Sequence, residues 1–184
     1  MPEFDRPASH KRRNRILDAG MKLALSNGVR ATTMQALARE AGVAKPTLYS
    51  YFPDKMALFA AIAQRLLVEL KQLVEQGLAE PGDVSERVAN ALIAKHCRIF
   101  SLLEGSPHAN EIYGEKGRFA KNEVETFERW LLQTLAAVLS EAGHQEPDEY
   151  SSLLIACAEG IARRATSKRQ IASSIELVCK KLLA

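Results

Sequence analysis

Apolar residues recur every three or four positions along most of the chain, which is the period of an α-helix that buries one face. In the first such run, Ile16, Gly20 and Leu23 fall on one face of a helix that begins at about residue 10. A longer apolar stripe with the same period occupies residues 58–73. No segment alternates apolar and polar residues as a half-buried strand does. The pattern therefore predicts an all-α protein.

Glycine, proline and small polar residues mark the ends of the expected helices. Gly28 can take the left-handed conformation that ends a helix, and Pro53 breaks the third helix. The hydroxyl of Thr32 or Thr33 can cap the second helix, and the four residues from Thr32 fit a capping box. Asp54 can cap the fourth helix. We expect helices over residues 10–27, 32–41, 45–52, 54–76, 85–103, 107–113, 118–142, 148–164 and 168–183.

Residues 32–52 combine two short helices with a turn centred on Gly42. This is the shape of a helix-turn-helix, whose second helix lies in the major groove of DNA. In that helix Leu48 and Phe52 point to the core, which leaves the hydroxyl groups around Tyr49 facing outward or sideways. Two helices joined by a glycine turn also occur as plain packing in many helical proteins, so the motif by itself leaves both interpretations open.

The charge of the chain is unevenly distributed. The sequence holds 25 lysines and arginines and 22 aspartates and glutamates, for a net charge of +3. Ten of the basic and five of the acidic residues lie in residues 1–55, which leaves that segment at +5 and the remainder at −2. This polarity suits a chain that meets an anion at one end, and the basic cluster over residues 11–15 could contact a DNA backbone or minor groove. The alternative is a solvated basic N-terminus.

Several other classes of protein are disfavoured. No stretch reaches the ~18 uncharged apolar residues of a membrane span, and the polar start lacks the apolar segment of a signal peptide. Cys97, Cys157 and Cys179 have no paired spacing and are expected to be reduced thiols. No nucleophile elbow, phosphate loop or metal-ligand spacing occurs. We therefore expect a cytoplasmic protein that is not an enzyme and that uses neither a cofactor nor a metal.

The stretch RILDAGMKLALSNGVRATTMQALAREAGVAKPTLYSYFPDKMALF carries a dense series of short motifs. They are Gly28, Thr32-Thr33, Leu37-Ala38, Ala41-Gly42-Val43, Thr47-Leu48-Tyr49, Tyr51-Phe52, and Lys55 with Leu58. In these motifs residues 10–60 resemble the N-terminal domain of the TetR/AcrR family of bacterial transcriptional regulators. The chain departs from the family pattern at Ala44, where the family often has serine, and at Pro46, where it often has glycine. Ala44 has no hydroxyl with which to cap the recognition helix.

The resemblance implies a domain plan and a set of DNA contacts. With residues 1–9 expected as a disordered leader, it implies a three-helix helix-turn-helix DNA-binding domain over 10–55 and a helical regulatory and dimerisation domain over 56–184. It implies phosphate contacts by Thr33, Thr47, Tyr49, Tyr51 and Lys55, and an approach to base edges by Ala44, Lys45, Pro46 and Ser50. Lys45 is the only long donor near the base edges and could reach guanine O6 and N7.

The resemblance also implies a homodimer on palindromic operator DNA, because a two-fold site requires a two-fold protein. The last two helices are the interface candidates. Their apolar stripes are Leu153, Leu154, Cys157, Gly160 and Ile161 on one helix and Ile171, Ile175, Val178 and Leu182 on the other. Both stripes could instead face their own core.

A small-molecule effector is expected in the second domain by the same resemblance. The candidate lining residues are His96, Phe100, Tyr113, Phe127, Trp130 and Leu131. Aromatic residues and histidines on an apolar helix face more often serve packing than ligand binding. The sequence offers no further means of choosing between the two roles.

The expected function is repression of transcription, which the effector relieves by shifting the helix over 54–76. One alternative keeps the fold and the DNA binding but replaces the small ligand with a protein partner. A second alternative is a structural helical protein whose first domain no longer reads DNA. The hydroxyls and lysines at the expected contact positions argue against the second alternative.

Overall fold

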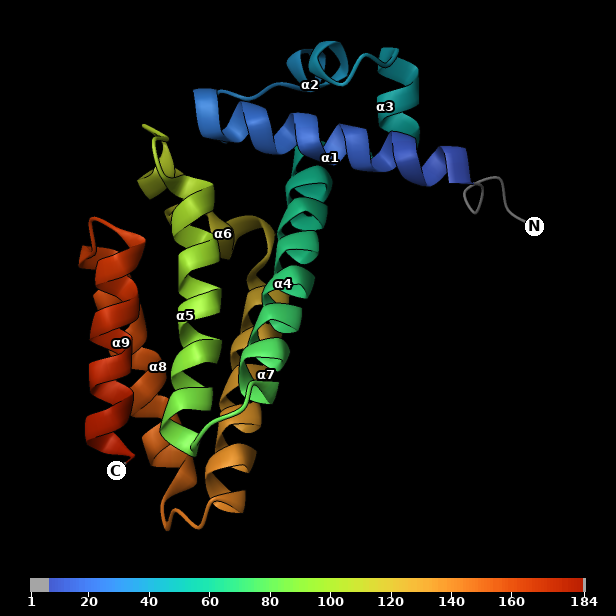
Figure 1. Cartoon of the computed structure of the whole chain (residues 1–184). Coiled ribbons are helices and arrows are strands. Elements are labelled where there is room, and N and C mark those ends of the chain that lie inside the picture. The colour runs from blue at the N-terminus through green and yellow to red at the C-terminus, as the bar shows by residue number, and fades with distance from the viewer. Residues whose placement is uncertain (1–6, 184) are drawn as a thin grey trace. The chain divides into compact units, whose positions relative to one another are not determined.

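The computed structural model describes residues 7–183, except for the side chains of residues 7, 113, 116 and 117. Every regular element in this range is an α-helix, which confirms the expected fold class (Figure 1). The helices are α1 (Pro7–Asn27), α2 (Met34–Glu40), α3 (Lys45–Tyr51), α4 (Lys55–Ala79), α5 (Val84–Leu103), α6 (Ala109–Phe119), α7 (Lys121–Glu141), α8 (Pro147–Arg164) and α9 (Lys168–Leu182).

The described chain forms two compact units. The first contains the residues up to Leu66 together with Gly105–Val124, and the second contains Leu67–Glu104 together with the residues from Glu125 onward. These units differ from the domains expected from the sequence, which were divided after residue 55. The difference arises because the start of α4 packs in the first core and because α6 joins the first unit.

The core of the first unit forms where α1, α2, α3 and the start of α4 meet. In Figure 1, α2 and α3 lie along one side of α1. Ile16, Leu37, Leu48 and Leu58 are fully buried there, at the positions that the helical period places on inner faces. Gly20 allows α1 to approach α4 closely, since an added Cβ would lie 2.6 Å from Ile62 Cδ1. Burial of these side chains fixes the direction of α3.

Helix α6 is longer than its expected range of 107–113 and continues through Gly114 to Phe119. A glycine inside a helix costs about 1 kcal/mol relative to alanine. Burial compensates here, because Ile112 and Phe119 pack against the first core and the Phe119 ring lies 5.7 Å from that of Phe59. Packing therefore overrides the local signal to stop, and α7 begins at Lys121 rather than at residue 118.

The second unit is a helical bundle in which α5, α8 and α9 pack on one another (Figure 1). Helix α4 was expected to end near residue 76 but continues to Ala79. The reason is that Gly77 serves a close approach rather than a helix end, since its added Cβ would lie 2.5 Å from the backbone nitrogen of Ala91 in α5. Helix α5 then starts with a capping box between Asp83 and Glu86.

Two helix starts differ in detail from the sequence-based expectation. Thr33 caps α2 by accepting a hydrogen bond from the Ala36 backbone N–H, whereas Thr32 is buried and donates to the Gly28 carbonyl. The expected capping box from Thr32 is therefore absent. Helix α1 begins at Pro7, so residues 7–9 are helical rather than part of a leader. Proline suits the first turn of a helix because its missing N–H has no intrahelical partner there. Residues 1–6 of the expected leader lie outside the described range.

Candidate nucleic-acid interface

The turn between α2 and α3 sets the direction of α3, which is the recognition helix expected from the sequence and is called the reading helix below. Gly42 adopts a left-handed φ of 59°, which a residue with a side chain rarely takes. The Val43 N–H donates to the Ala38 carbonyl at 3.0 Å and closes the turn. Leu48 is buried on the inner side of α3, as predicted. The opposite face of α3 is consequently turned to solvent.

The residues expected to approach base edges lie on this solvent-facing side. Ala44, Lys45, Pro46 and Ser50 are all exposed. The Ser50 hydroxyl donates to the Thr47 carbonyl at 2.7 Å, so its oxygen lone pairs remain available to accept. Ala44 stands at the N-cap without a side-chain hydrogen bond, as its lack of a hydroxyl predicts. Lys45 is the one long donor of this set.

The residues expected to contact phosphates differ in how exposed their side chains are. Tyr49 and Thr33 are exposed, and Thr47 is half-buried. Tyr51 is half-buried as well, with its hydroxyl 3.0 Å from the hydroxyl of Ser9 in α1. This contact fixes the end of α3 against the start of α1.

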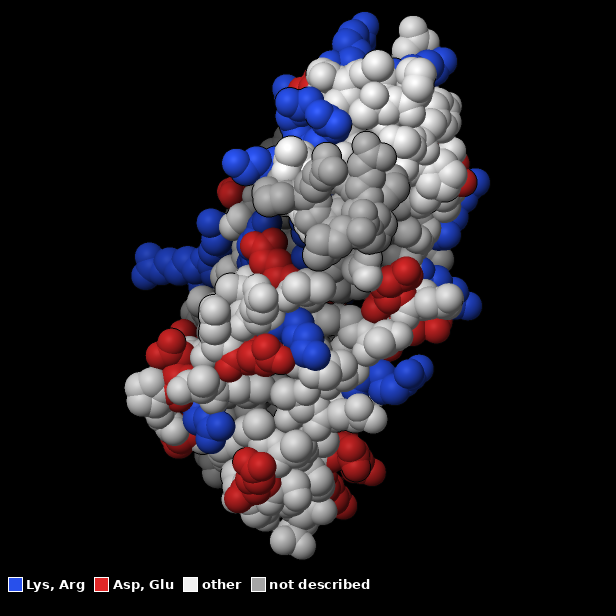
Figure 2. Space-filling model, turned by 90° about the vertical axis from the view of Figure 1, so that its right-hand side faces the viewer, with Lys and Arg blue, Asp and Glu red and all other residues white. Residues whose placement is uncertain are grey.

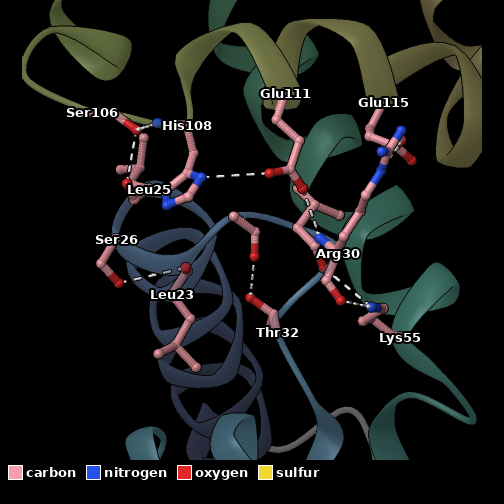
Figure 3. Close-up of polar contacts among 12 residues, drawn as sticks. Leu23, Leu25, Ser26, Arg30, Thr32, Lys55, Ser106, His108, Glu111 and Glu115 are labelled. Atoms are coloured by element: carbon pink, nitrogen blue, oxygen red, sulfur yellow. Dashed lines mark hydrogen bonds and ion pairs between the residues drawn. The ribbon is translucent and has the colours of Figure 1, made fainter.

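Lys55 has a structural role that the sequence did not indicate. Its ammonium group donates to the carbonyls of Val29 and Arg30 at 3.1 and 3.0 Å (Figure 3). An ammonium has three N–H donors, so one remains for a phosphate. The partners lie about 25 residues away in the chain, a separation that produces no periodic signal.

Arg30 connects the α1–α2 turn to α6 through several polar contacts (Figure 3). Its Nε and Nη2 donate to Glu115 Oε1 at 2.8 and 2.6 Å, and its backbone N–H donates to Glu111 Oε1 at 2.7 Å. Glu111 and Glu115 are four residues apart and so lie on one face of α6. The bond to Glu115 raises the pKa of Arg30 and, with the charge of Arg118, holds the pKa of Glu115 below its usual range.

The end of α1 has further contacts with the segment that contains α6. Gly28 has a φ of 84°, and an added Cβ would clash with the Glu111 carboxylate. The Ser106 hydroxyl donates to the Leu25 carbonyl at 2.7 Å (Figure 3). Gly28 thus ends α1, as predicted, and also leaves room for a side chain of α6.

The basic residues at the start of α1 are mostly exposed. Lys11, Arg12 and Arg15 are turned to solvent, and blue side chains are prominent over the first unit in Figure 2. Two arginines also make contacts within the unit. The Arg13 guanidinium lies 5.5 Å from the centre of the Phe52 ring, and Arg15 Nη2 donates to the Gly42 carbonyl at 3.3 Å. The charges of Arg13 and Arg15 therefore lie close to the turn that positions α3.

The residues expected to line an effector pocket differ in burial. His96, Phe127 and Leu131 are buried, and Phe100 and Trp130 are half-buried. The Phe127 and Trp130 rings lie 5.6 Å apart, and Lys71 Nζ lies 4.7 Å above the Trp130 ring. The side chain of Tyr113 lies outside the described residues.

The apolar stripes of α8 and α9 are divided between the core and the surface. Leu154, Ile171 and Ile175 are buried in the second unit. Leu153 of α8 is 47% exposed and Leu177 of α9, which the predicted stripe did not include, is 59% exposed. Cys157, Ile161, Val178 and Leu182 are half-buried, and Gly160 is exposed.

Comparison with known proteins adds to this picture. Residues 16–62 match the model of a family described as bacterial regulatory proteins, tetR family. The HTH-type transcriptional regulator YvkB of Bacillus subtilis is 36% identical over 138 residues, which cover 71% of this chain and 67% of the relative. The HTH-type transcriptional repressor KstR of Rhodococcus jostii is 41% identical over 75 residues, 41% of this chain. A crystal structure of a TetR/AcrR-family regulator from Thermobifida fusca has a TM-score of 0.73 at 22% identity, covering 94% of this chain and 97% of that one.

The fold and the exposed reading helix define a helix-turn-helix protein with a helical second unit. The family match and the relative from Bacillus subtilis show that the chain belongs to the TetR family of bacterial transcriptional regulators. The chain spans only 34% of the length of the Rhodococcus KstR. None of the helices in residues 7–183 combines the length and apolar character needed to cross a bilayer.

Proposed function

We propose that this chain is a sequence-specific DNA-binding repressor of transcription. The observation that carries the proposal is the outer face of α3, where Lys45, Tyr49 and Ser50 are exposed. A helix held in this way fits the major groove, where side-chain donors and acceptors distinguish base pairs. The charge of +5 on residues 1–55 favours the phosphate backbone.

The test is binding of the full-length protein to DNA that flanks its own gene, at two salt concentrations and with competitor DNA. Saturable binding that survives the competitor supports specific reading. If competitor DNA and higher salt both abolish binding, the first unit binds DNA only through non-specific attraction to its basic surface. That result would overturn the proposal.

The repressor is proposed to act as a homodimer through α8 and α9. Exposed Leu153 and Leu177 supply apolar surface, and the exposed Gly160 lets a second backbone approach. Among the residues that the structure describes, no atom outside the adjoining backbone of α8 lies within 4 Å of a Cβ added at Gly160, so packing within the described chain does not explain this glycine. A two-fold dimer would present two copies of α3 to the two halves of a palindrome.

A small molecule bound by the second unit is proposed to release the operator. Helices α4 and α7 each run from one unit into the other, so a ligand that favours one arrangement of these helices can act on the first unit. Allosteric coupling of this kind is typically ~1–3 kcal/mol, or roughly 5–150-fold in affinity. Equal operator binding by ligand-free and ligand-bound protein would contradict this part of the proposal.

A protein partner in place of the small molecule would need an exposed apolar surface on the second unit of this chain, separate from the proposed dimer interface. Among the side chains that the structure describes in the second unit, Val68 is the one large apolar residue exposed outside α8 and α9. A single side chain does not make a docking surface, since interfaces bury many residues. The exposure pattern therefore favours a small-molecule effector.

A further inference from the structure

The turn between α8 and α9 in the second unit carries a cluster of basic side chains. Helices α8 and α9 pack side by side, and a short turn joins them (Figure 1). Four exposed basic residues stand at this turn, and they are called the basic turn below: Arg163, Arg164, Lys168 and Arg169. No acidic residue occurs between Glu159 and Glu176. The second unit as a whole holds 14 acidic and 11 basic residues, so the basic turn is a local positive surface on a unit of net negative charge.

The basic turn is not neutralised by carboxylates of the chain. No side chain within the described residues forms an ion pair with any of its four cations. Glu159 stands four residues before Arg163, but its carboxylate lies 4.0 Å from Lys95 Nζ instead. Arg98 of the same unit, by contrast, makes two hydrogen bonds to the Glu69 carboxylate. The charge of the basic turn is therefore available to an outside anion.

The placement of Lys168 and Arg169 opposes the electrostatics of α9. Both stand in its first turn, directly after the N-cap Ser167, and no acidic residue accompanies them there. The start of a helix carries a partial positive charge, so cations are unfavourable at this end and favourable at the other. Lys180 and Lys181, in the last turn of α9, are explained by this rule. A local conflict of the kind seen at Lys168 and Arg169 is typical of functional positions.

Hydrogen bonds on both sides of the turn hold its backbone in place. Ser167 Oγ accepts from the Gln170 N–H at 3.2 Å, and Gln170 Oε1 accepts from the Thr166 N–H at 3.0 Å. The Cys97 thiol of α5 donates to the Lys168 carbonyl at 3.8 Å. A backbone that is already ordered loses less conformational entropy when its side chains bind a partner.

The surroundings of the basic turn favour duplex DNA over other polyanions. None of the large apolar side chains that the structure shows exposed lies in residues 160–170, so the turn lacks the apolar side chains that enter a lipid bilayer. A second copy of the chain would place like charges opposite one another in a two-fold contact. Duplex DNA carries one charge per ~1.7 Å of its axis, so it can meet several of these cations at once. A duplex bound by the first unit would also be at a raised local concentration for a second basic surface of the same chain.

We propose that the basic turn is a second DNA-binding surface of this protein, which contacts backbone phosphates while α3 contacts bases. Arginine forks and lysine ammonium groups both donate to phosphate oxygens. Such contacts add affinity without sequence preference, and they make binding more sensitive to salt. The inference goes beyond the proposed function, because a contact with phosphates needs no reading of bases.

The test compares the full chain with the double variant Lys168→Gln/Arg169→Gln in binding to a long duplex of unrelated sequence over a range of salt concentrations. Each lost phosphate contact lowers the slope of log affinity against log salt by about 0.9, so the slope should fall by about 1.8 for each bound chain. The melting temperature should not fall, since two unfavourable cations leave the first turn of α9. The matched control is Lys180→Gln/Lys181→Gln, which removes the same charge from the other end of α9 and should keep the wild-type slope.

An unchanged slope in the first double variant, or an equal fall in the control, would overturn the inference. Vesicles of phosphatidylcholine with phosphatidylglycerol test the membrane alternative. If the first double variant loses binding to these vesicles but keeps its DNA slope, the basic turn contacts lipid and the inference is wrong.

The same variants separate the inference from the proposed function. Lys168→Gln/Arg169→Gln should keep the wild-type ratio of affinities for operator and unrelated DNA, because phosphate contacts carry no sequence information. A protein that distinguishes operator but has the same slope in this variant refutes the inference alone. A protein that binds all duplexes alike, with a slope that depends on Lys168 and Arg169, refutes the proposed function alone.

Discussion

Lys45 and Lys55 stand near the two ends of the reading helix but have different surroundings. Lys45 is exposed on the first turn of α3, whereas Lys55 uses two of its donors on the α1–α2 turn. Lys45→Ala should relax discrimination at one base pair, with a loss of about 1–3 kcal/mol on the preferred sequence. Lys55→Met should weaken binding to all sequences alike and lower the slope of log affinity against log salt by about one.

Competition binding with single-base variants of the operator distinguishes these two outcomes. Lys22→Ala, which alters an exposed lysine of α1 paired with Glu40 of α2, is the control. If Lys45→Ala lowers the affinity by the same factor for every operator variant, Lys45 contacts a phosphate rather than a base. A thermal melt of Lys55→Met is needed alongside, because the two turn carbonyls lose their donor.

His96 makes the protein sensitive to acid in a definite direction. Burial, together with Lys95, lowers the pKa of His96 from 6.5 to about 3. Between these two pH values the unfolded chain binds a proton that the folded chain does not, so stability is lost as the pH falls. The loss should approach about 1.4 kcal/mol per pH unit. Urea unfolding at several pH values should show this slope in the wild type and not in His96→Phe, and an unchanged slope in His96→Phe would refute the assignment.

Helix positions followed from the sequence more reliably than helix ends. The inner faces around Leu37, Leu48 and Leu58 were predictable because the helical period repeats locally. Gly77 and Gly114 were misleading, because a glycine marks either a helix end or a close approach, and only the packing partner decides which. The Arg30–Glu115 pair was not predictable, since a contact across 85 residues leaves no local pattern.

Gly77 and Gly160 are matched glycines inside helices with opposite environments. An added Cβ at Gly77 would lie 2.5 Å from the backbone of α5, whereas at Gly160 it would meet no described atom within 4 Å outside the adjoining backbone of its own helix. Gly77→Ala should therefore destabilise the protein by more than about 1 kcal/mol through forced separation of the helices. In the dissociated monomer, where no second copy faces α8, Gly160→Ala should leave the chain as stable or about 0.5–1 kcal/mol more stable, by helix propensity. Denaturant unfolding at protein concentrations low enough to keep the chain monomeric measures both, and similar effects from the two substitutions would contradict the packing described for Gly77.

The attachment of α6 to the α1–α2 turn should depend on the ionisation of Glu115. Its hydrogen bond to Arg30 lowers its pKa from the ordinary 4.5. The stability that ionised Glu115 contributes through this bond is therefore fully present above its ordinary pKa and is lost as the pH falls through the lowered pKa. Glu115→Gln should have a lower melting temperature than the wild type at neutral pH, and the difference should shrink in acid. Glu128→Gln, at an exposed position of α7, is the control, and a difference that persists unchanged in acid would rule out this origin.

At the scale of the whole molecule, the first unit is built from two separate stretches of chain. The segment Gly105–Val124 returns to the unit that contains α1 to α3 after α5 has been completed. Helical periodicity describes each helix alone, so it does not show which helices share a core. The contacts of α6 with Arg30 and Gly28 join this later segment to the unit that contains α1 to α3.

The proposed dimer places a specific requirement on α8 and α9. Leu153 and Leu177 are both exposed in the single chain, at 47% and 59%, and would be buried between two copies. Leu153→Arg or Leu177→Arg would place a buried charge without a partner on each side of a two-fold interface, which is strongly destabilising. Sedimentation should then show dissociation into monomers, with unchanged melting of the isolated chain.

Val68→Arg provides the matched control, because Val68 of α4 is 54% exposed and lies outside the proposed interface. This variant should remain dimeric and bind the operator normally. The two leucine variants should bind a full palindrome hardly better than a half-site, because coupling between the two first units would be lost. If they stay dimeric, or if Val68→Arg dissociates as readily, the interface lies elsewhere. Such a result would leave the reading of DNA by α3 intact, since each first unit contains its own buried core and its own exposed α3.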